Sequence, residues 1–212
     1  MTPTVTPVIP SVTDPDPNGT YSYADSYADY VSWRFEELVE LWRGKIMRRM
    51  SGPTDRHQMV VGNLFGLLHS HLRHQPCQVR VAPYDVRLPK RGTTADAAIY
   101  TVVQPDVCVI CDASKIEPRG CLGAPDLVLE VTSPRTAARD WKGKFDLYEE
   151  SGVQEYWIVM PQENDIAVFV RDAATGHFQL AGEYGSPGPI ACATLPELQL
   201  DWLDIFPDCP LV

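Results

Sequence analysis

The chain has 212 residues and a mass of 23.7 kDa, which suits one domain with a sizeable buried core. Hydrophobic residues make up 44% of the sequence and charged residues 22%, a globular composition that excludes collagen-like, coiled-coil and wholly disordered proteins. The formal net charge of −10 argues against a protein that coats nucleic acid by bulk electrostatic attraction.

The sequence indicates a soluble cytoplasmic protein with no membrane partner. No apolar run approaches the ~18 residues of a membrane span, and the opening MTPTVTPVIP lacks the basic region of a secretory signal. The 6 cysteines are too few for a disulfide scaffold and are interpreted as buried small hydrophobes in a reducing compartment. Residues 1–20, rich in Pro, Thr, Ser and Asp, predict a disordered leader before a single domain over 21–212.

The first predicted elements are a short helix over 27–33 and a hairpin whose two strands flank Arg43–Gly44. Apolar residues at steps of three to four then predict an amphipathic helix that begins near Asp55 and ends before Pro76. Extended segments rich in Val and Ile follow, each bounded by Pro or Gly. These segments cover 78–88, 101–111 and 124–132.

The pattern then returns to a helix, in which Trp141, Phe145 and Tyr148 lie on one face and which Gly152 ends. Three more strands follow, over 153–160, 165–171 and 177–181. This order of elements predicts a mixed α/β domain whose sheet has a helix on each face.

One predicted strand carries a carboxylate inside an apolar run. Side chains alternate along a strand, so Asp126, Val128 and Glu130 share one face. Burying an ionised carboxylate costs several kcal/mol unless it is paired or holds a cation, so Glu130 requires a partner. The alternative is an edge strand whose glutamate points to water.

A second acid, Asp106, opens the apolar strand VCVIC, and strand pairing could bring it beside Glu130. Carboxylates on adjacent strands lie ~5 Å apart, which suits one hard divalent cation, Mg²⁺ or Mn²⁺. Asp126 is ~13 Å from Glu130 along the strand and is interpreted as a cap or turn residue. The helix that follows the Glu130 strand could place the ammonium of Lys144 over the site, the alternative being a solvated helix charge.

Five segments carry a likeness to a known family: TYSYADSYADYVSW, ELWRGKIMRRMSGPTDRHQ, QPDVCVIC, GAPDLVLEVTSPRTAARDWKGKFDLYEESGVQEYWIVMP and LPELQLDWLDIF. Over about residues 21–206 the chain resembles the Uma2 endonuclease family, the DUF820 type. The resemblance implies membership of the PD-(D/E)XK nuclease superfamily. It also implies a restriction-endonuclease-like α/β fold, in which helices flank a central mixed β-sheet that has an extra N-terminal hairpin and extra C-terminal strands.

The resemblance implies three catalytic residues. Asp106 corresponds to the aspartate of the PD motif and Glu130 to the acid of the second half-motif. The superfamily pattern places lysine two residues after that acid, where this chain has Thr132. Members of this type carry the lysine on the following helix, where Lys144 matches. Second-rank positions in the family-like segments are Glu40 and Asp85, either of which could complete the metal shell, and His57 at the entrance of a helix.

These residues predict an endonuclease that hydrolyses DNA phosphodiester bonds with Mg²⁺ or Mn²⁺ as cofactor. Asp106, Glu130 and the carbonyl of Val131 would hold the ion, and Lys144 would orient or deprotonate the attacking water. Three basic residues, Arg135, Arg139 and Lys142, are expected to contact phosphates without reading bases. We also expect a homodimer, which would place two sites on a duplex.

Two alternatives remain open for the function: a catalytically inactive nuclease fold used as a binding or assembly module, and a hydrolase of a small phosphoester.

Cys108 and Cys111 spell CxxC, but residues three apart on a strand face opposite ways, so packing is predicted instead of a zinc site. Tyr148, one helical turn after Lys144, is interpreted as packing against the sheet and not as a catalytic acid.

Overall fold

The computed structural model describes residues 26–32, 39–48, 53–90, 94–132 and 137–207, and within these ranges the strands form two six-stranded sheets and one two-stranded sheet. Three predicted features lie outside the described residues: the leader at 1–20, the helix end at Trp33, and Arg135. None of the helices in the described ranges is both long and apolar enough to cross a membrane.

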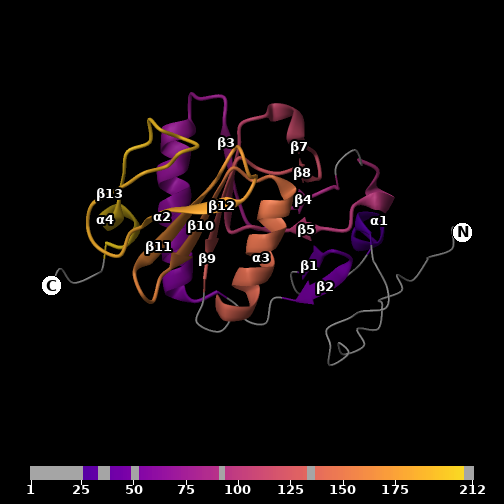
Figure 1. The fold of residues 1–212 in the computed structure, drawn as a ribbon, viewed down its shortest axis with the longest axis horizontal. Helices are drawn as coiled ribbons and strands as arrows, with labels where there is room; N and C mark the ends of the chain where they lie inside the picture. The colour runs from indigo at the N-terminus through magenta and orange to yellow at the C-terminus, as the bar shows by residue number, and fades with distance from the viewer. Residues whose placement is uncertain (1–25, 33–38, 49–52, 91–93, 133–136, 208–212) are drawn as a thin grey trace, which may run out of the picture.

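The central sheet is mixed and organises the rest of the chain (Figure 1). Its strands, in spatial order, are β12 (Phe178–Glu183), β11 (Asp165–Arg171), β10 (Glu155–Met160), β9 (Leu127–Val131), β6 (Val107–Ile110) and β3 (Gln78–Val81). Strand β9 pairs in parallel with β10 and antiparallel with β6, so it is an inner strand. All five of its residues are buried, as expected for a strand covered on both faces.

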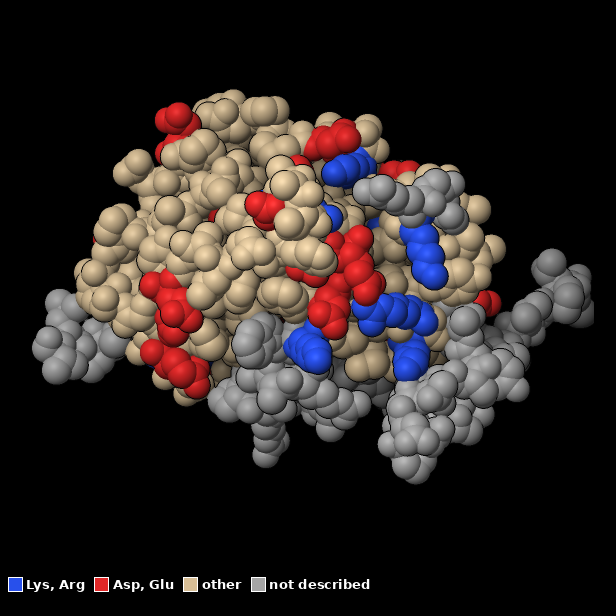
Figure 2. Space-filling view, in the orientation of Figure 1, with Lys and Arg blue, Asp and Glu red and all other residues tan. Residues whose placement is uncertain are grey.

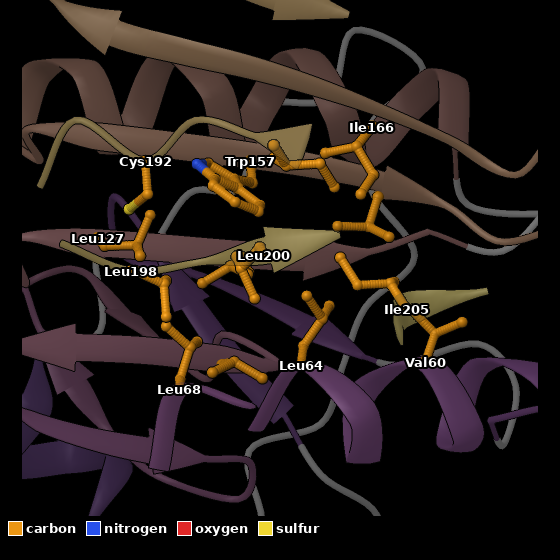
Figure 3. Close-up of a cluster of buried hydrophobic side chains, with 14 of the residues drawn as sticks. Val60, Leu64, Leu68, Leu127, Trp157, Ile166, Cys192, Leu198, Leu200 and Ile205 are labelled. Atoms are coloured by element: carbon orange, nitrogen blue, oxygen red, sulfur yellow. The ribbon is translucent and has the colours of Figure 1, made fainter. Parts of the chain in front are cut away.

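Helix α2 (Asp55–Leu72) covers one face of the central sheet. The hydroxyl of Thr54 caps its first turn by accepting the backbone N–H of His57. Leu64 and Leu68, one helical turn apart, are 0% and 1% exposed and pack among the side chains of Figure 3. The same cluster is closed by β13 (Pro189–Ile190), β14 (Leu200–Asp201) and α4 (Trp202–Ile205).

Helix α3 (Ala137–Ser151) lies on the opposite face, so the prediction of a helix on each face is confirmed (Figure 1). It packs Leu147 and Tyr148 against side chains of β9 and β10. The helix ends at the predicted glycine: Gly152 has φ +91°, a conformation that is costly for other residues. The next N–H, that of Val153, closes the helix by donating to the Tyr148 carbonyl.

A second sheet contains the predicted hairpin. Its strands, in order, are β2 (Lys45–Arg48), β1 (Val39–Trp42), β5 (Val102–Val103), β4 (Val86–Arg87), β8 (Gly120–Leu122) and β7 (Ile116–Glu117). Short helices accompany it: α1 (Tyr27–Tyr30), η1 (Asp96–Ala98) and η2 (Ala113–Lys115). Positive φ angles of 50° and 80° at Arg43 and Gly44 make the tight two-residue turn between β1 and β2. The chain passes from this sheet to the central sheet through residues 104–106.

The cysteine interpretation is wrong at two positions, because Cys77 and Cys111 form a disulfide next to the last β3–β6 pair. Cys108 is a buried free thiol, as predicted for a packing residue. Burial raises the pKa of that thiol, and its side chain belongs to the cluster under α3. Asp126 is a turn residue, as predicted: its carboxylate accepts the backbone N–H of Cys111 at 2.7 Å.

The hairpin reaches α3 through a contact that requires glycine. Gly143 lies in α3 against the ring of Trp42, the last residue of β1. A Cβ atom at position 143 would be 2.6 Å from Trp42 Cζ3, closer than real side chains approach. The missing side chain therefore lets β1 lie directly beside the helix turn that carries Lys144.

Replacing Gly143 by alanine is expected to lower the free energy of unfolding. The clash with Trp42 overpacks this contact and costs ~1–3 kcal/mol, whereas alanine gains about 1 kcal/mol over glycine in helix propensity. Urea denaturation measures the net change in the free energy of unfolding. Gly66→Ala in α2 is the matched control, because no heavy atom lies within 4 Å of its added Cβ. It should stabilise the protein by ~0.5–1 kcal/mol. Equal stabilisation by both substitutions would refute the contact.

Candidate active site

The two carboxylates singled out in the sequence lie opposite each other on neighbouring strands. The β6–β9 register pairs Val107 with Leu129, and one further step places Asp106 opposite Glu130. Both residues are buried, at 4% and 7% exposure. The alternative of a solvated edge-strand glutamate is wrong, because β9 is an inner strand and the Glu130 side chain points to the α3 side.

Glu130 is held from α3 by two donors that meet one of its oxygens. Lys144 Nζ lies 2.7 Å from Glu130 Oε1, and the Tyr148 hydroxyl donates to the same oxygen at 2.6 Å. Residues four apart lie on one helix face, so both donors reach the same strand. The alternative of a solvated Lys144 is wrong, since its exposure is 9%. Tyr148 packs on the sheet as predicted, but the sequence interpretation missed its hydrogen bond, which the four-residue spacing from Lys144 could have indicated.

Asp106 is fixed by groups from β9 and α2. Its Oδ2 atom accepts the backbone N–H of Val131 at 2.9 Å, and His57 Nε2 lies 3.4 Å from the same oxygen. His57 stands in the first turn of α2 and is 8% exposed. Its other ring nitrogen, Nδ1, is buried without a hydrogen-bond partner among the described residues. The structure thus brings this second-rank residue to the site.

The β6–β9 register places no backbone donor opposite the carbonyl of Val131. The N–H of Ala82 donates to the Asp106 carbonyl, so the backbone groups of Asp106 point to β3. Because backbone groups alternate in direction along a strand, those of the residues on either side of Asp106 point to β9. Continuing the register places Pro105 opposite Val131. Proline has no N–H, so the carbonyl of Val131 receives none from this position.

Glu40, on β1 of the second sheet, approaches the site from the hairpin. Its Oε1 lies 3.2 Å from Lys144 Nζ and accepts the backbone N–H of Gln104 at 2.8 Å. Its Oε2 accepts the indole N–H of Trp42 at 2.9 Å. Lys144 therefore lies between two carboxylates, one from each sheet.

Asp85 is farther from the centre. Its Oδ1 accepts the Tyr30 hydroxyl at 3.1 Å and the Gln104 side-chain amide at 2.8 Å. Within the described ranges its carboxylate contacts none of Asp106, Glu130 and Lys144. Gln104, which the sequence interpretation missed, links the two second-rank acids, because its backbone N–H bonds Glu40 and its side chain bonds Asp85. Its position beside Pro105–Asp106 was the available signal.

The site concentrates negative charge in a buried place. Burial raises the pKa of Glu130 to about 7. The charge of the nearby Lys144 lowers this pKa, whereas the charges of Asp106 and Glu40 raise it further. Burial lowers the pKa of Lys144, but the three carboxylates outweigh burial and raise it above its usual value, so its ammonium stays charged. Burial and the Glu130 charge raise the pKa of Tyr148, which keeps its hydroxyl protonated.

The donors present fit a hard divalent cation that keeps part of its water shell. Within the described part of the chain, no group of three or more His, Cys, Asp and Glu side chains is placed to hold a metal. Mg²⁺ commonly takes one or two carboxylates and completes its octahedron with water, which matches Asp106, Glu130 and the Val131 carbonyl. The excess of carboxylates over the Lys144 ammonium favours the same ion.

Basic side chains lie near the site on one face of the molecule. Figure 2 shows Lys and Arg gathered over the β1–β2 hairpin, beside acidic side chains over α3. Arg43 at the hairpin turn forms an exposed 2.6 Å ion pair with Glu150 of α3. Of the three predicted phosphate-contacting residues, Lys142 is exposed on α3. Arg139 belongs to α3, but its side chain, like all of Arg135, lies outside what the structure describes.

Known proteins resemble this chain in sequence and in fold. The model of the Uma2 family, described as "Putative restriction endonuclease", matches residues 27–203. An uncharacterized protein of Synechocystis sp., slr1290, is 29% identical over 144 residues, which cover 66% of this chain and 71% of the relative. A crystal structure titled as a "putative nuclease belonging to DUF820", from Anabaena variabilis, matches with a TM-score of 0.67 and 19% identity. It covers 86% of this chain and 98% of that one, and it supports the fold.

Lys144→Met should destabilise the protein more at about pH 8 than at about pH 5.5. Removing one partner of a buried ion pair costs ~3–5 kcal/mol when the other stays charged. Glu130, with its raised pKa of about 7, is mainly ionised at the higher pH and mainly protonated at the lower. Urea denaturation at both pH values measures the difference. Lys142→Met, an exposed position on the same helix, should change stability little at either pH, and a pH-independent loss in Lys144→Met would refute the electrostatic role.

Proposed function

Because the chain belongs to the Uma2 family, we propose that it is a metal-dependent endonuclease that hydrolyses phosphodiester bonds in DNA. The observation that carries the proposal is the convergence of Asp106 and Glu130, from neighbouring strands, with Lys144 from the helix above them. Structural ion pairs also bury carboxylates, but among the described residues Lys144 is shared between two of them, Glu130 and Glu40. The family's description as a putative restriction endonuclease supports a nuclease in particular.

Asp106, Glu130 and the Val131 carbonyl would hold Mg²⁺ or Mn²⁺. When bound, such an ion lowers the pKa of coordinated water and stabilises charge on a phosphoryl oxygen. The protein's contribution is to hold two carboxylates at fixed strand positions before the ion arrives. The backbone N–H of Val131 and the ring of His57 keep Asp106 in place, and such supporting contacts orient metal ligands.

Lys144 would offset the negative charge that develops on the scissile phosphate. Its raised pKa favours this role over that of a general base, because the ammonium remains protonated at neutral pH. Glu40 would serve mainly to hold Lys144, since both of its oxygens already accept donors from the protein. Asp85 would support Glu40 through Gln104 and would not complete the metal shell.

DNA would approach over the β1–β2 hairpin, where basic side chains gather beside the acidic side chains of α3 (Figure 2). Lys142, Arg139 and Arg135 are proposed to contact phosphates. Contacts of this kind position the duplex without reading its sequence. The homodimer remains a prediction, and gel filtration would test it.

Cleavage of plasmid and single-stranded DNA with Mg²⁺ or Mn²⁺ tests the site. Asp106→Asn and Glu130→Gln should each lower the cleavage rate by about two orders of magnitude, because each replaces a charged carboxylate ligand of the ion by a neutral amide. Asp126→Asn, just before β9, is the matched control: among the described residues its side chain bonds a backbone N–H away from the site, so cleavage should persist.

Three outcomes would contradict the proposal in different ways. Unchanged cleavage in both site variants would mean that Asp106 and Glu130 are not the metal ligands. A parent protein that neither cleaves DNA nor binds a divalent cation would favour a binding or assembly module. Hydrolysis of a small phosphoester without affinity for DNA would favour the other alternative.

Affinity for Mn²⁺ should rise with pH through about 7. The proton on Glu130 must leave before the carboxylate binds an ion, and its pKa of about 7 places that competition at neutral pH. Titration calorimetry from about pH 5.5 to about pH 8.5 measures the dependence. In Glu130→Gln the affinity should be low and nearly flat with pH, whereas a flat profile in the parent protein would count against Glu130 as a ligand.

A further inference from the structure

The two oxygens of Glu130 have unequal surroundings. Lys144 and Tyr148 both contact Oε1, at 2.7 and 2.6 Å, and no donor among the described residues contacts Oε2. A carboxylate has about four lone-pair sites, so two donors could have been shared between its oxygens. Their placement on one oxygen leaves the other available to a ligand.

Tyr148 is fixed in this position by its surroundings. The residue is 0% exposed, and its ring is tilted against that of Tyr156 with centroids 5.1 Å apart. Four residues separate it from Lys144, so the two side chains approach Glu130 from the same face of α3. A short bond from a neutral hydroxyl to a charged carboxylate is among the stronger hydrogen bonds in proteins.

We propose that Tyr148 is a positioning residue of the metal site, whose hydroxyl holds Glu130 Oε1 so that Oε2 is presented to the cation. The inference rests on the proposed function, because it assigns a role within the same site. Supporting contacts of this kind tune the affinity of a metal ligand without touching the metal. Tyr148 itself contacts neither the ion nor the DNA in this role.

A purely structural role would explain the burial of the ring but not the placement of the hydroxyl. Phenylalanine would fill the same space between α3 and the sheet, and it would need no acceptor. A tyrosine is required here only if the bond to Glu130 matters. The two roles therefore predict different results when the hydroxyl alone is removed.

Tyr148→Phe removes that hydroxyl and keeps the ring. Tyr156→Phe is the matched control, because Tyr156 belongs to the same cluster and is 1% exposed. Its hydroxyl has no hydrogen bond to Glu130 among the described residues. Titration calorimetry with MnCl₂ gives the dissociation constant of each protein, and circular dichroism and thermal unfolding verify the fold.

The dissociation constant for Mn²⁺ should rise about tenfold in Tyr148→Phe and stay within about twofold of the parent in Tyr156→Phe. The Mg²⁺ concentration for half-maximal DNA cleavage should rise in parallel. The rate at saturating Mg²⁺ should remain close to that of the parent, because Lys144 and both metal ligands are still present.

The outcomes separate this inference from the proposed function. A lower unfolding temperature in Tyr148→Phe with an unchanged dissociation constant would show a structural hydroxyl and overturn the inference alone. Equal weakening in both variants would overturn it as well, since the effect would then belong to the aromatic cluster. A parent protein that binds no Mn²⁺ would overturn the proposed function, and the inference with it.

Discussion

The burial of negative charge where β6 meets β9 is the constraint on which the other features of the site depend. Asp106 and Glu130 lie in a ladder of apolar residues, where an unpaired carboxylate would cost several kcal/mol. Among the described residues, an ammonium, two neutral donors and an imidazole contact these acids, and Glu40 brings a third carboxylate to the ammonium. Lys144 is thereby shared between Glu130 and Glu40, and this surplus of carboxylate is what the proposed cation would balance.

The second sheet explains how this arrangement is kept in place. Glu40 comes from a hairpin far from α3 in sequence, and the absence of a side chain at Gly143 allows Trp42 to lie against the helix. The indole of Trp42 then bonds Glu40, which contacts Lys144. The segment that leaves this sheet begins with Gln104, whose backbone N–H bonds the same carboxylate. The two sheets thus meet at the ion pairs of Lys144.

Local patterns were enough to predict helices α2 and α3, the hairpin and the alternation of side chains along β9. For Asp106 and Glu130 the sequence indicated only that strand pairing could bring them together, and the ~5 Å spacing of adjacent strands then suggested a shared site. The Cys77–Cys111 disulfide and the Gln104 contacts did not follow, since each joins strands whose register depends on the whole fold. Periodicity indicates which face of a helix or strand a residue occupies, but not which atoms its side chain contacts on that face.

A second buried glutamate shows why burial alone does not mark a functional site. Glu155 on β10 is 0% exposed, and the sequence interpretation passed over it. Its Oε1 accepts Trp157 Nε1 and the backbone N–H of Ala193, and its Oε2 accepts the backbone N–H of Thr194. Both oxygens are therefore satisfied, and the residue fastens the C-terminal segment to the sheet. Glu130 is also buried, but among the described residues it receives its donors on one oxygen only, so the distribution of donors, and not the depth of the charge, distinguishes it from this structural carboxylate.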